Sequence, residues 1–409
     1  MRCKKMKQKR LMLLGGLRYL LPVIEEAHKL GIYVITADYL PNSIAHKYSD
    51  EYCNVSIIDK EMVLKEAQKR NIDGIISFAV DPGVVTAAYV AEKMGLPFQC
   101  SYESACILQN KSRFRQFLAE NGFNCPLSKD YDCLEDAMSD VSSFRYPLIV
   151  KPVDSAGSKG VARVNDKSEL GKAVQTALRN SISNKIIIED FLDVVGYQSS
   201  TDMFSIDGRI VFPVFSDQLF DDKADNPFVP TVEIWPSTMP YPYQQDLVNQ
   251  LNRLFELLKC KNGLYNIECR ICSNRKAYLM EVSPRGGGNH IALLQDMAYG
   301  TNFIENEIRA SLGEELRMTT PHEIDGAWCI YSIHPTKNLQ GVLKSVRFNE
   351  RVEKNHLRFL DLAVKANDVI RPLTGANMEL GDAMLSFATR NDLDYSISNM
   401  SNLLKVEIN

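Results

Sequence analysis

Short apolar runs alternate with longer amphipathic segments over the first hundred residues of the chain. Runs with the length and composition of buried strands occupy residues 11–14, 32–35 and 73–78. The segments between them have helical spacing. Asp81-Pro82 is a favourable helix start, because an aspartate side chain can cap it, and Gly95 is a favourable stop. Strands that alternate with helices in this way predict a parallel, doubly wound sheet.

From about residue 111 the pattern changes to strand pairs and loops. The predicted elements are a helix over 111–120, a strand–loop–strand unit over 146–164, a β run at 186–188, hairpins over 199–216 and 264–283, and a mixed α/β segment over 321–409. Residues 217–243 are rich in Asp, Pro and aromatic residues and predict a long irregular connection. Connections of this type often cover a substrate site.

The composition indicates a globular chain of two or three domains. The 409 residues are 45% hydrophobic, and 47 basic residues stand against 51 acidic ones. The net charge of −4 predicts no nucleic-acid partner, and the chain lacks the apolar run of ~20 residues that a membrane span needs. The ten cysteines do not have the spacing of a disulfide framework, so we expect reduced thiols in a cytoplasmic protein.

The N-terminus allows a second interpretation. Six of the first ten residues are Lys or Arg, and the apolar run that follows resembles the core of a signal peptide. Arg18 interrupts that run, however, and no small-residue cleavage site follows it. We therefore expect residues 1–9 to be a solvated lead-in to a buried first strand.

Three familiar motifs are incomplete. Gly15-Gly16 follows the first strand but lacks the G-x-G-x-x-G spacing, so we expect a Rossmann-like shape without NAD. No G-x-x-x-x-G-K-[ST] sequence is present, which excludes a P-loop. Cys269 and Cys272 have the spacing of half a zinc site, but residues three apart on a strand point to opposite faces, which argues against zinc.

Lys151 ends an apolar strand and is followed by a loop of small residues, Ser155 to Gly160. Backbone N–H groups in such a loop can approach phosphate oxygens closely, and a lysine at a fixed position adds a positive charge. The same segment is also compatible with an ordinary hairpin loop beside a solvated lysine. It therefore indicates phosphate binding only in combination with other motifs.

A pair of glutamates gives an independent signal. If the turn at 273–276 closes a symmetric hairpin, Glu268 lies directly opposite Glu281, with Arg270 on the same face. Opposed carboxylates repel each other unless a cation bridges them, and their oxygens suit Mg²⁺. The alternative is an acidic pair that Arg270 or Arg285 neutralises.

Five separated motifs, taken in order, resemble the ATP-grasp superfamily and its carboxylate–amine ligase branch, which includes bacterial L-amino acid ligases and relatives similar to carbamoyl phosphate synthase. They are Lys111, Lys151 with its loop, Glu189-Asp190-Phe191-Leu192, Glu268, and Glu281-Val-Ser-Pro-Arg285-Gly-Gly-Gly. The resemblance implies an α/β and α+β architecture. Its parts are a Rossmann-like N-terminal domain over 1–108, an ATP-grasp domain over 109–316 with a flap subdomain at about 125–188, and a C-terminal α+β subdomain over 317–409.

The resemblance also implies roles for individual residues. Lys111 and Lys151 match the lysines that hold ATP phosphates. The matches to the flexible flap loop are Ser155, Gly157, Ser158 and Gly160, and those to the adenine site are Glu189, Asp190 and Leu192. Gln198 stands where the family usually has an acidic residue that contacts ribose.

The remaining matches concern metal and chemistry. Glu268 and Glu281 match ligands of two Mg²⁺ ions, for which Mn²⁺ can substitute, and Ser283 stands in place of the usual Asn. Arg285 matches the arginine that meets the reacting phosphoryl and carboxylate groups, and with Lys151 it forms the expected catalytic pair. His290 is predicted either to contribute to the substrate pocket or to be structural.

The implied function is a ligase that activates a carboxylate as an acyl phosphate and couples it to an amine, releasing ADP and phosphate. The expected partners are small molecules with an amino-acid or peptide-like character, and the expected assembly is a homodimer. Two alternatives remain: a purine-biosynthesis-like enzyme, and a nucleotide-binding protein without turnover, which Gln198 and Ser283 suggest.

Overall fold

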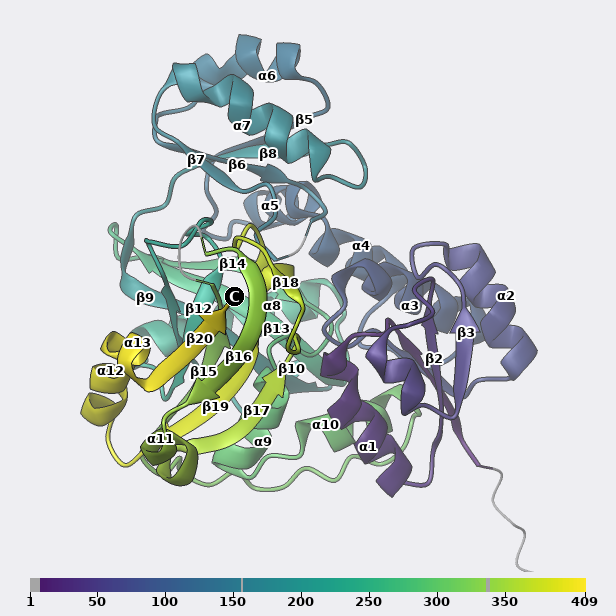
Figure 1. Ribbon diagram of the computed structural model, residues 1–409. Coiled ribbons are helices and arrows are strands. Elements are labelled where there is room, and N and C mark those ends of the chain that lie inside the picture. Colours follow the sequence, from purple (N-terminus) through teal and green to yellow (C-terminus); the bar gives the residue numbers. More distant parts are fainter. Residues whose placement is uncertain (1–7, 156, 336–338) are drawn as a thin grey trace, which may run out of the picture.

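The N-terminal region folds as the predicted parallel sheet. The computed structural model describes residues 8–155, 157–335 and 339–409 (Figure 1). Four parallel strands lie in the order β3-β2-β1-β4. Their bounds are β1 Arg10–Leu14, β2 Tyr33–Asp38, β3 Glu51–Asn54 and β4 Gly74–Ile76, and the helices of this region include α1 Leu21–Lys29, α2 Lys60–Arg70 and α3 Asp81–Met94. Residues 11–14 are fully buried, which confirms the prediction of a buried first strand. Of the predicted lead-in, residues 1–7 lie outside the described residues.

Helix α3 begins differently from the prediction. Its N-cap is Val80, and Asp81 is the first helical residue and makes no capping hydrogen bond. The prediction that Asp81 caps the helix is therefore wrong, because its carboxylate is used by Arg285 and Ser283, far away in the sequence. The predicted stop is confirmed, since Gly95 is the C-cap with φ of +67°.

The flap projects from the rest of the molecule, at the top of Figure 1. Its antiparallel sheet has the order β5-β8-β6-β7, with β5 Ser128–Tyr131, β6 Leu148–Pro152, β7 Ala162–Val164 and β8 Ile186–Asp190. Helices α6 Leu134–Asp140 and α7 Lys167–Arg179 cover one face, where their apolar side chains pack on those of the strands. Helices α4 Tyr102–Gln109 and α5 Lys111–Glu120 join the flap to the N-terminal region.

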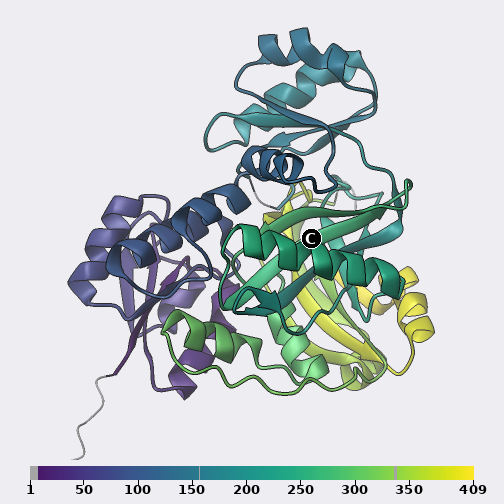
Figure 2. The ribbon, with the colours of Figure 1, turned by 180° about the vertical axis from the view of Figure 1, so that it is seen from behind.

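The central sheet carries the predicted glutamate hairpin. Its order is β10-β9-β13-β14, with β9 Val194–Ile206, β10 Arg209–Ile210, β13 Gly263–Cys272 and β14 Ala277–Ser283. Helix α8 Tyr241–Leu257 lies across this sheet, as Figure 2 shows, and buries its apolar side chains against β13. Helix α10 Phe303–Ser311, which follows α9 Ile291–Tyr299, packs on the opposite face of the sheet. There Phe303 contacts Phe204 of β9.

The last part of the chain shares a sheet with the segment predicted to be irregular. Strands β11 Asp217–Phe220 and β12 Pro230–Trp235 form a hairpin inside 217–243. That prediction is wrong because β12 also pairs with β15, so ladder hydrogen bonds outweigh the Asp/Pro-rich composition. The five-stranded order is β11-β12-β15-β19-β17, with β15 Ala327–Ile333, β17 Leu357–Leu362 and β19 Gly381–Phe387.

A smaller three-stranded sheet and short helices complete the C-terminal part. The sheet has the order β18-β16-β20, with β16 Gly341–Phe348, β18 Val369–Ile370 and β20 Leu404–Ile408, and the helices are α11 Glu350–Asn355, α12 Arg390–Ser398 and α13 Met400–Leu403. Their apolar side chains pack on the outer face of the five-stranded sheet. Among the described residues, no helix has the length and apolar character to cross a membrane.

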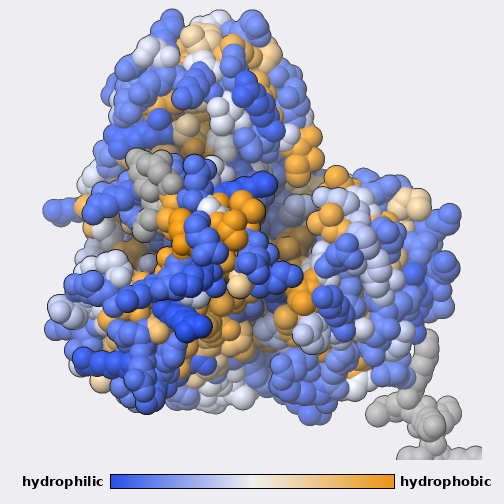
Figure 3. Space-filling model, in the orientation of Figure 1, coloured by the Kyte–Doolittle hydropathy of each residue, from blue (hydrophilic) through white to orange (hydrophobic). Residues whose placement is uncertain are grey.

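The N-terminal sheet docks on a glycine-rich loop that follows β14. The Ala79 N–H donates to the Gly286 carbonyl at 3.1 Å, and the buried Phe78 ring lies against Gly286. A Cβ placed on Gly286 comes within 2.4 Å of that ring, so only glycine fits there. The molecular surface is hollowed between the flap and the N-terminal region (Figure 3).

We expect Gly286→Ala to disturb this docking. Because the Phe78 ring is buried, it cannot move aside, and such overpacking costs roughly 1–3 kcal/mol of unfolding free energy. The matched control is Gly288→Ala, since a Cβ on Gly288 meets nothing within 4 Å. Urea unfolding of both variants checks the prediction, and equal stabilities would show that the contact with Phe78 is unimportant.

Candidate functional site

The two predicted metal-binding glutamates face each other across the central hairpin. Glu268 pairs with Glu281, and Asn266 pairs with Ser283, as the sequence predicted. A bulge between Glu268 and Cys269 shifts the register by one residue toward the turn. The bulge thus leaves the opposed carboxylates in place although the hairpin is not symmetric throughout.

Burial and mutual repulsion raise the energy of this pair when both glutamates are charged. Burial raises the pKa of Glu268 to about 7, and the nearby charge of Glu281 adds to the shift. Lys111 offsets part of the repulsion, because its Nζ lies 3.5 Å from a carboxylate oxygen of Glu281. The side chain of Glu281 is 27% exposed, which leaves the pair open to an incoming cation.

Lys111 links the hairpin to the flap loop. It is the first residue of α5, whose N-cap Asn110 accepts a hydrogen bond from the Arg113 N–H at 3.1 Å. Its Nζ donates to the Ser155 carbonyl at 3.0 Å while lying close to Glu281. One ammonium group therefore holds the strand pair and the predicted phosphate loop together.

Lys151 and Glu189 form a buried ion pair on the flap. Leu148 and Val150 face the flap core, so Lys151 lies on the opposite face of β6, which is the face turned away from α6 and α7. Its Nζ donates to Glu189 at 2.6 Å, and Arg115 pairs with the other carboxylate oxygen of Glu189 at 2.8 Å. An ammonium has three N–H donors, so two remain for a ligand.

The charges of this pair shift in the directions expected for buried groups. Burial lowers the pKa of Lys151 to about 8, although Glu189 opposes the shift. The pKa of Glu189 falls to about 2, because Arg115 and Lys151 together outweigh the effect of its burial. Glu189 is thus an anion that is fully engaged with two cations.

The loop after β6 is docked on two neighbouring segments. The Ser158 hydroxyl donates to the Phe228 carbonyl at 2.7 Å, and the Gly157 carbonyl accepts from the Ala376 N–H at 3.1 Å. Gly157 and Gly160 have φ of +66° and +73°, which glycine adopts without strain. Ala156 lies outside the described residues. The predicted phosphate loop is thus fixed by contacts at its middle.

The residues predicted to bind adenine and ribose lie where the chain passes from the last flap strand, β8, into β9 of the central sheet. Asp190 ends β8 and is partly buried, which raises the pKa of its carboxyl, and Leu192 is partly buried in the following turn. Gln198 lies on β9 and donates to Gln218 at 2.7 Å. Its amide group is thus oriented by a neighbouring strand.

Arg285 is held by a residue of the N-terminal region. Its guanidinium donates from Nε to Asp81 at 2.8 Å, and its Nη2 pairs with the same oxygen at 2.6 Å. Ser283 donates to that oxygen at 3.2 Å and accepts from Gln109, so its hydroxyl is already hydrogen-bonded. Burial lowers the pKa of Arg285, but the neighbouring carboxylates, Asp81 first, outweigh it and hold the group charged.

The glycine-rich loop after Arg285 is fixed by Asp202. Both Asp202 carboxylate oxygens accept from the Gly287 N–H, at 2.9 and 2.8 Å, and one accepts from Asn266. His290 follows the loop and contacts Asp361 at 2.8 Å. His290 is therefore tied to the C-terminal part of the chain through a carboxylate.

Sequence reasoning missed two of the polar residues in this site. Asp81 lies just beyond the carboxyl end of β4, the edge where ligands of parallel sheets bind, and this position could have indicated it. Arg115 lies one helical turn after Lys111 on α5, so helical spacing could have placed both on one face. The hydrogen bonds from Gly287 to Asp202 join residues that are distant in sequence, so no local sequence pattern could have indicated them.

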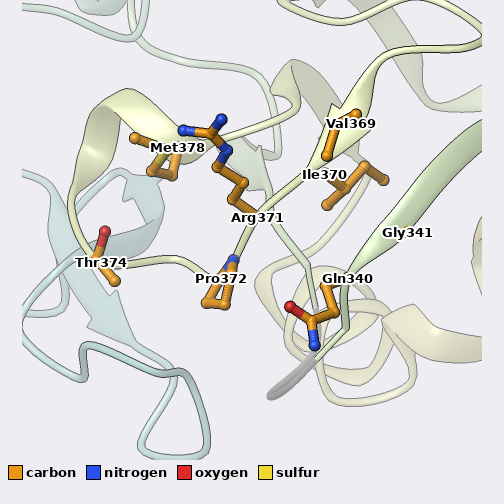
Figure 4. A pocket seen from close by; sticks show the side chains of 8 residues that line it. All are labelled: Gln340, Gly341, Val369, Ile370, Arg371, Pro372, Thr374 and Met378. Atoms are coloured by element: carbon orange, nitrogen blue, oxygen red, sulfur yellow. The ribbon is translucent and has the colours of Figure 1, made fainter.

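Other features of the molecule lie apart from these residues. Cys269 is buried in the apolar core beside α8, where burial raises its pKa to about 12. A pocket of about 690 Å³ lies between residues 340–341 and 369–378 (Figure 4). Arg371 is the charged residue in its lining, and none of the predicted site residues lines it.

Comparisons with known proteins confirm the resemblance. A family model of the ATP-grasp domain matches residues 144–292. Formate-dependent phosphoribosylglycinamide formyltransferase of Prochlorococcus marinus is 25% identical over 316 residues, which cover 74% of this chain and 76% of that protein. The carbamoyl phosphate synthase large chain of Clostridium beijerinckii is 22% identical over 265 residues, which cover 64% of this chain but 24% of that protein.

Solved structures share the fold over almost the whole chain. L-amino acid ligase from Bacillus licheniformis has a TM-score of 0.80 at 20% identity, with 98% of this chain and 99% of that chain covered. The biotin carboxylase domain dimer of Hydrogenobacter thermophilus 2-oxoglutarate carboxylase, in complex with MgADP, ADP and bicarbonate, has a TM-score of 0.73 at 14% identity. The coverage is 98% of this chain and 90% of that chain. The predicted mixed α/β architecture is confirmed.

The raised pKa of Glu268 makes stability without metal depend on pH. Between about pH 4.5 and pH 7 the folded protein holds this proton more tightly than the unfolded chain, so stability falls as pH rises. At pH 8 we expect Glu268→Gln to be more stable than the parent protein by about 3 kcal/mol, and near pH 4.5 the difference should vanish.

Urea unfolding at both pH values, without Mg²⁺ or nucleotide, measures this difference. The matched control is Glu256→Gln, an exposed position on α8 that should show no pH-dependent difference. A Glu268→Gln protein that is less stable at pH 8 would mean that Lys111 and the nearby arginines already compensate the pair.

Proposed function

We propose that this chain, an ATP-grasp protein, is an ATP- and Mg²⁺-dependent ligase that activates a carboxylate as an acyl phosphate and couples it to an amine. The match of residues 144–292 to the ATP-grasp domain supports this class, and the observation that carries the finer assignment is the opposed pair Glu268–Glu281 with Lys111 beside it. Such a site suits a metal-bound polyphosphate. The two carboxylates can bind the metal cation, and the lysine can bind the negatively charged phosphate oxygens.

Nucleotide binding is assigned to the groups around the flap loop. Lys111 and Lys151 bind the phosphates, and the backbone of Ser155, Gly157, Ser158 and Gly160 closes over them. The adenine edge meets Asp190 and Leu192, and Gln198 donates to a ribose hydroxyl. Glu189, which the resemblance placed at adenine, acts through Lys151, because both its oxygens are engaged by cations.

Glu268 and Glu281 have the chemistry of Mg²⁺ ligands. Both are carboxylates, they lie directly opposite each other, and the raised pKa of Glu268 supports the binding of a further positive charge there. Bound Mg²⁺ supplies charge neutralisation on the phosphate oxygens, with two ions as the expected number and Mn²⁺ as a substitute. Ser283 as a third ligand stays a prediction, since its hydroxyl bonds to Asp81.

The reaction then needs orientation rather than a protein nucleophile. A substrate carboxylate oxygen attacks the terminal phosphorus of ATP, the bond to ADP breaks, and an acyl phosphate forms. The amine nitrogen attacks the acyl carbon and phosphate leaves. An ammonium substrate gives up two protons, one carried by the phosphate and one lost to solvent. Arg285, fixed by Asp81, contacts the phosphoryl and carboxylate groups, and the docked loop excludes water.

The substrates are assigned to the amino-acid or peptide-like class. The fold shared with L-amino acid ligase from Bacillus licheniformis supports this class. A second candidate is a purine-biosynthesis-like reaction, which the similarity to the formate-dependent formyltransferase favours. Incubation with pooled amino acids, or with formate and phosphoribosylglycinamide, discriminates between them by ADP release.

The setting of the reaction is also assigned. The cysteines of the described chain are free thiols, which supports work in the cytoplasm on small molecules, without a nucleic-acid or membrane partner. The biotin carboxylase relative is a dimer, which supports a homodimer. Sedimentation of the purified chain checks the assembly.

Glu281→Gln should separate a catalytic glutamate pair from a structural one. Loss of a metal-ligand charge should lower ATP turnover by about two to three orders of magnitude and raise the Mg²⁺ concentration needed for half-maximal rate. The control Glu256→Gln should keep the parent rate. ADP release against Mg²⁺ concentration measures both effects. Near-normal turnover with a lowered melting temperature would mean that the pair is structural and would remove the basis of the proposal.

A further inference from the structure

A row of acidic side chains lines the inner face of the five-stranded sheet. On β12, β15 and β19, Glu233 pairs with Ile330, and Ile330 pairs with Met384, so these side chains share one face. Asp382 lies two residues before Met384 on the same face, and Asp361 pairs with it from β17. This face packs against the glycine-rich loop and α9.

Part of this acidic group lacks partners although it is buried. Glu379, two residues before β19, is 5% exposed, and neither of its carboxylate oxygens has a hydrogen bond of normal geometry among the described residues, although the nearby Ser332 hydroxyl partly offsets the rise of its pKa. The same holds for one oxygen of Glu233 and one of Asp382. Buried carboxylates without partners are costly, so a native structure keeps them where something binds.

The nearby cations already serve other carboxylates. Arg18 pairs with Asp361 at 3.2 Å and with Asp382 at 2.5 Å, and His290 pairs with Asp361 at 2.8 Å. No ion pair within the described residues involves Glu379 or Glu233. Burial, followed by the charge of Asp382, raises the pKa of Glu379 well above its ordinary value, although Arg18 opposes this rise.

The acidic group adjoins the proposed reaction centre. Glu233 lies close enough to Glu268 for the two charges to repel each other, and the charge of Glu233 also raises the pKa of Glu379. Arg18 reaches the group from the loop after β1, at the carboxyl edge of the N-terminal sheet. Through Glu233 the acidic group therefore adjoins the metal-binding hairpin, and through Asp382 it contacts Arg18 of the N-terminal region.

We propose, on the basis of the ligase function above, that Glu379, Glu233 and Asp382 bind the ammonium group of the amine substrate. An ammonium has three donors for these acceptors and supplies the missing positive charge. A phosphorylated substrate would meet repulsion here, so the proposal selects an amino acid or a peptide over a ribonucleotide. The three atoms of His290, Asp361 and Asp382 have metal-ligand spacing, but Asp361 is already engaged by both Arg18 and His290, so we place no metal there.

Binding of a cationic probe tests the site without requiring turnover. Glycinamide carries an ammonium at pH 7 and has no carboxylate, whereas acetamide is its neutral counterpart. We expect glycinamide, but not acetamide, to raise the melting temperature of the parent protein, and Glu379→Gln to abolish the effect. Glu350→Gln is the control, because this side chain is 79% exposed on α11.

Three outcomes of this binding test are informative. Loss of the glycinamide effect in Glu379→Gln alone supports the site. No effect of glycinamide on the parent protein overturns it, and so does an equal effect on the parent protein and Glu379→Gln. Without ligand, Glu379→Gln should be at least as stable as the parent protein, since it removes an unpartnered charge.

A kinetic test separates failure of this site from failure of the ligase function. Hydroxylamine is neutral at pH 7 and traps an acyl phosphate as a hydroxamate. Glu379→Gln should keep hydroxamate formation near the parent rate but raise the KM for the amino-acid amine about tenfold or more. An unchanged KM overturns the ammonium site. If the parent protein forms no ATP-dependent hydroxamate with pooled carboxylates, the ligase proposal fails, and the glycinamide result then decides the site alone.

Discussion

Two carboxylates that face each other on one hairpin are the constraint on which the rest of the site depends. Glu268 and Glu281, which are both partly buried, repel each other as anions unless a positive charge lies beside them, and the chain brings one from another element. Lys111 provides it from the first turn of α5 and also holds the Ser155 carbonyl. The position of the flap loop is thus coupled to the charge state of the hairpin.

Similar couplings join the N-terminal sheet and the C-terminal strands to this centre. Asp81 at the start of α3 pairs with Arg285 and does not cap its own helix. Arg18, which follows β1, pairs with Asp382 on β19. The first contact lies next to the glycine-rich loop, which Asp202 fixes and against which Phe78 packs. Each outer region therefore contributes a charged group to the site, which explains why the three regions must be folded together for it to form.

Local patterns allowed much of this architecture to be predicted from the sequence. The opposition of Glu268 and Glu281 follows from strand alternation and a short turn, and the structure has it despite the bulge. The β11–β12 hairpin was missed because its stability comes from pairing with β15, almost a hundred residues later. The roles of Asp81 and Arg115 were missed for the same reason, since each depends on a partner distant in sequence.

In the proposed function, the hairpin pair holds a divalent ion on the phosphates of a bound nucleotide. The most direct measurement is a crystal structure with ADP and Mn²⁺, in which anomalous scattering locates the metal. We expect an anomalous peak in contact with a carboxylate oxygen of both Glu268 and Glu281, and Lys111 and Lys151 in contact with the phosphate oxygens. A nucleotide bound with its metal away from this pair, or with Lys111 still paired to Glu281 alone, would contradict it.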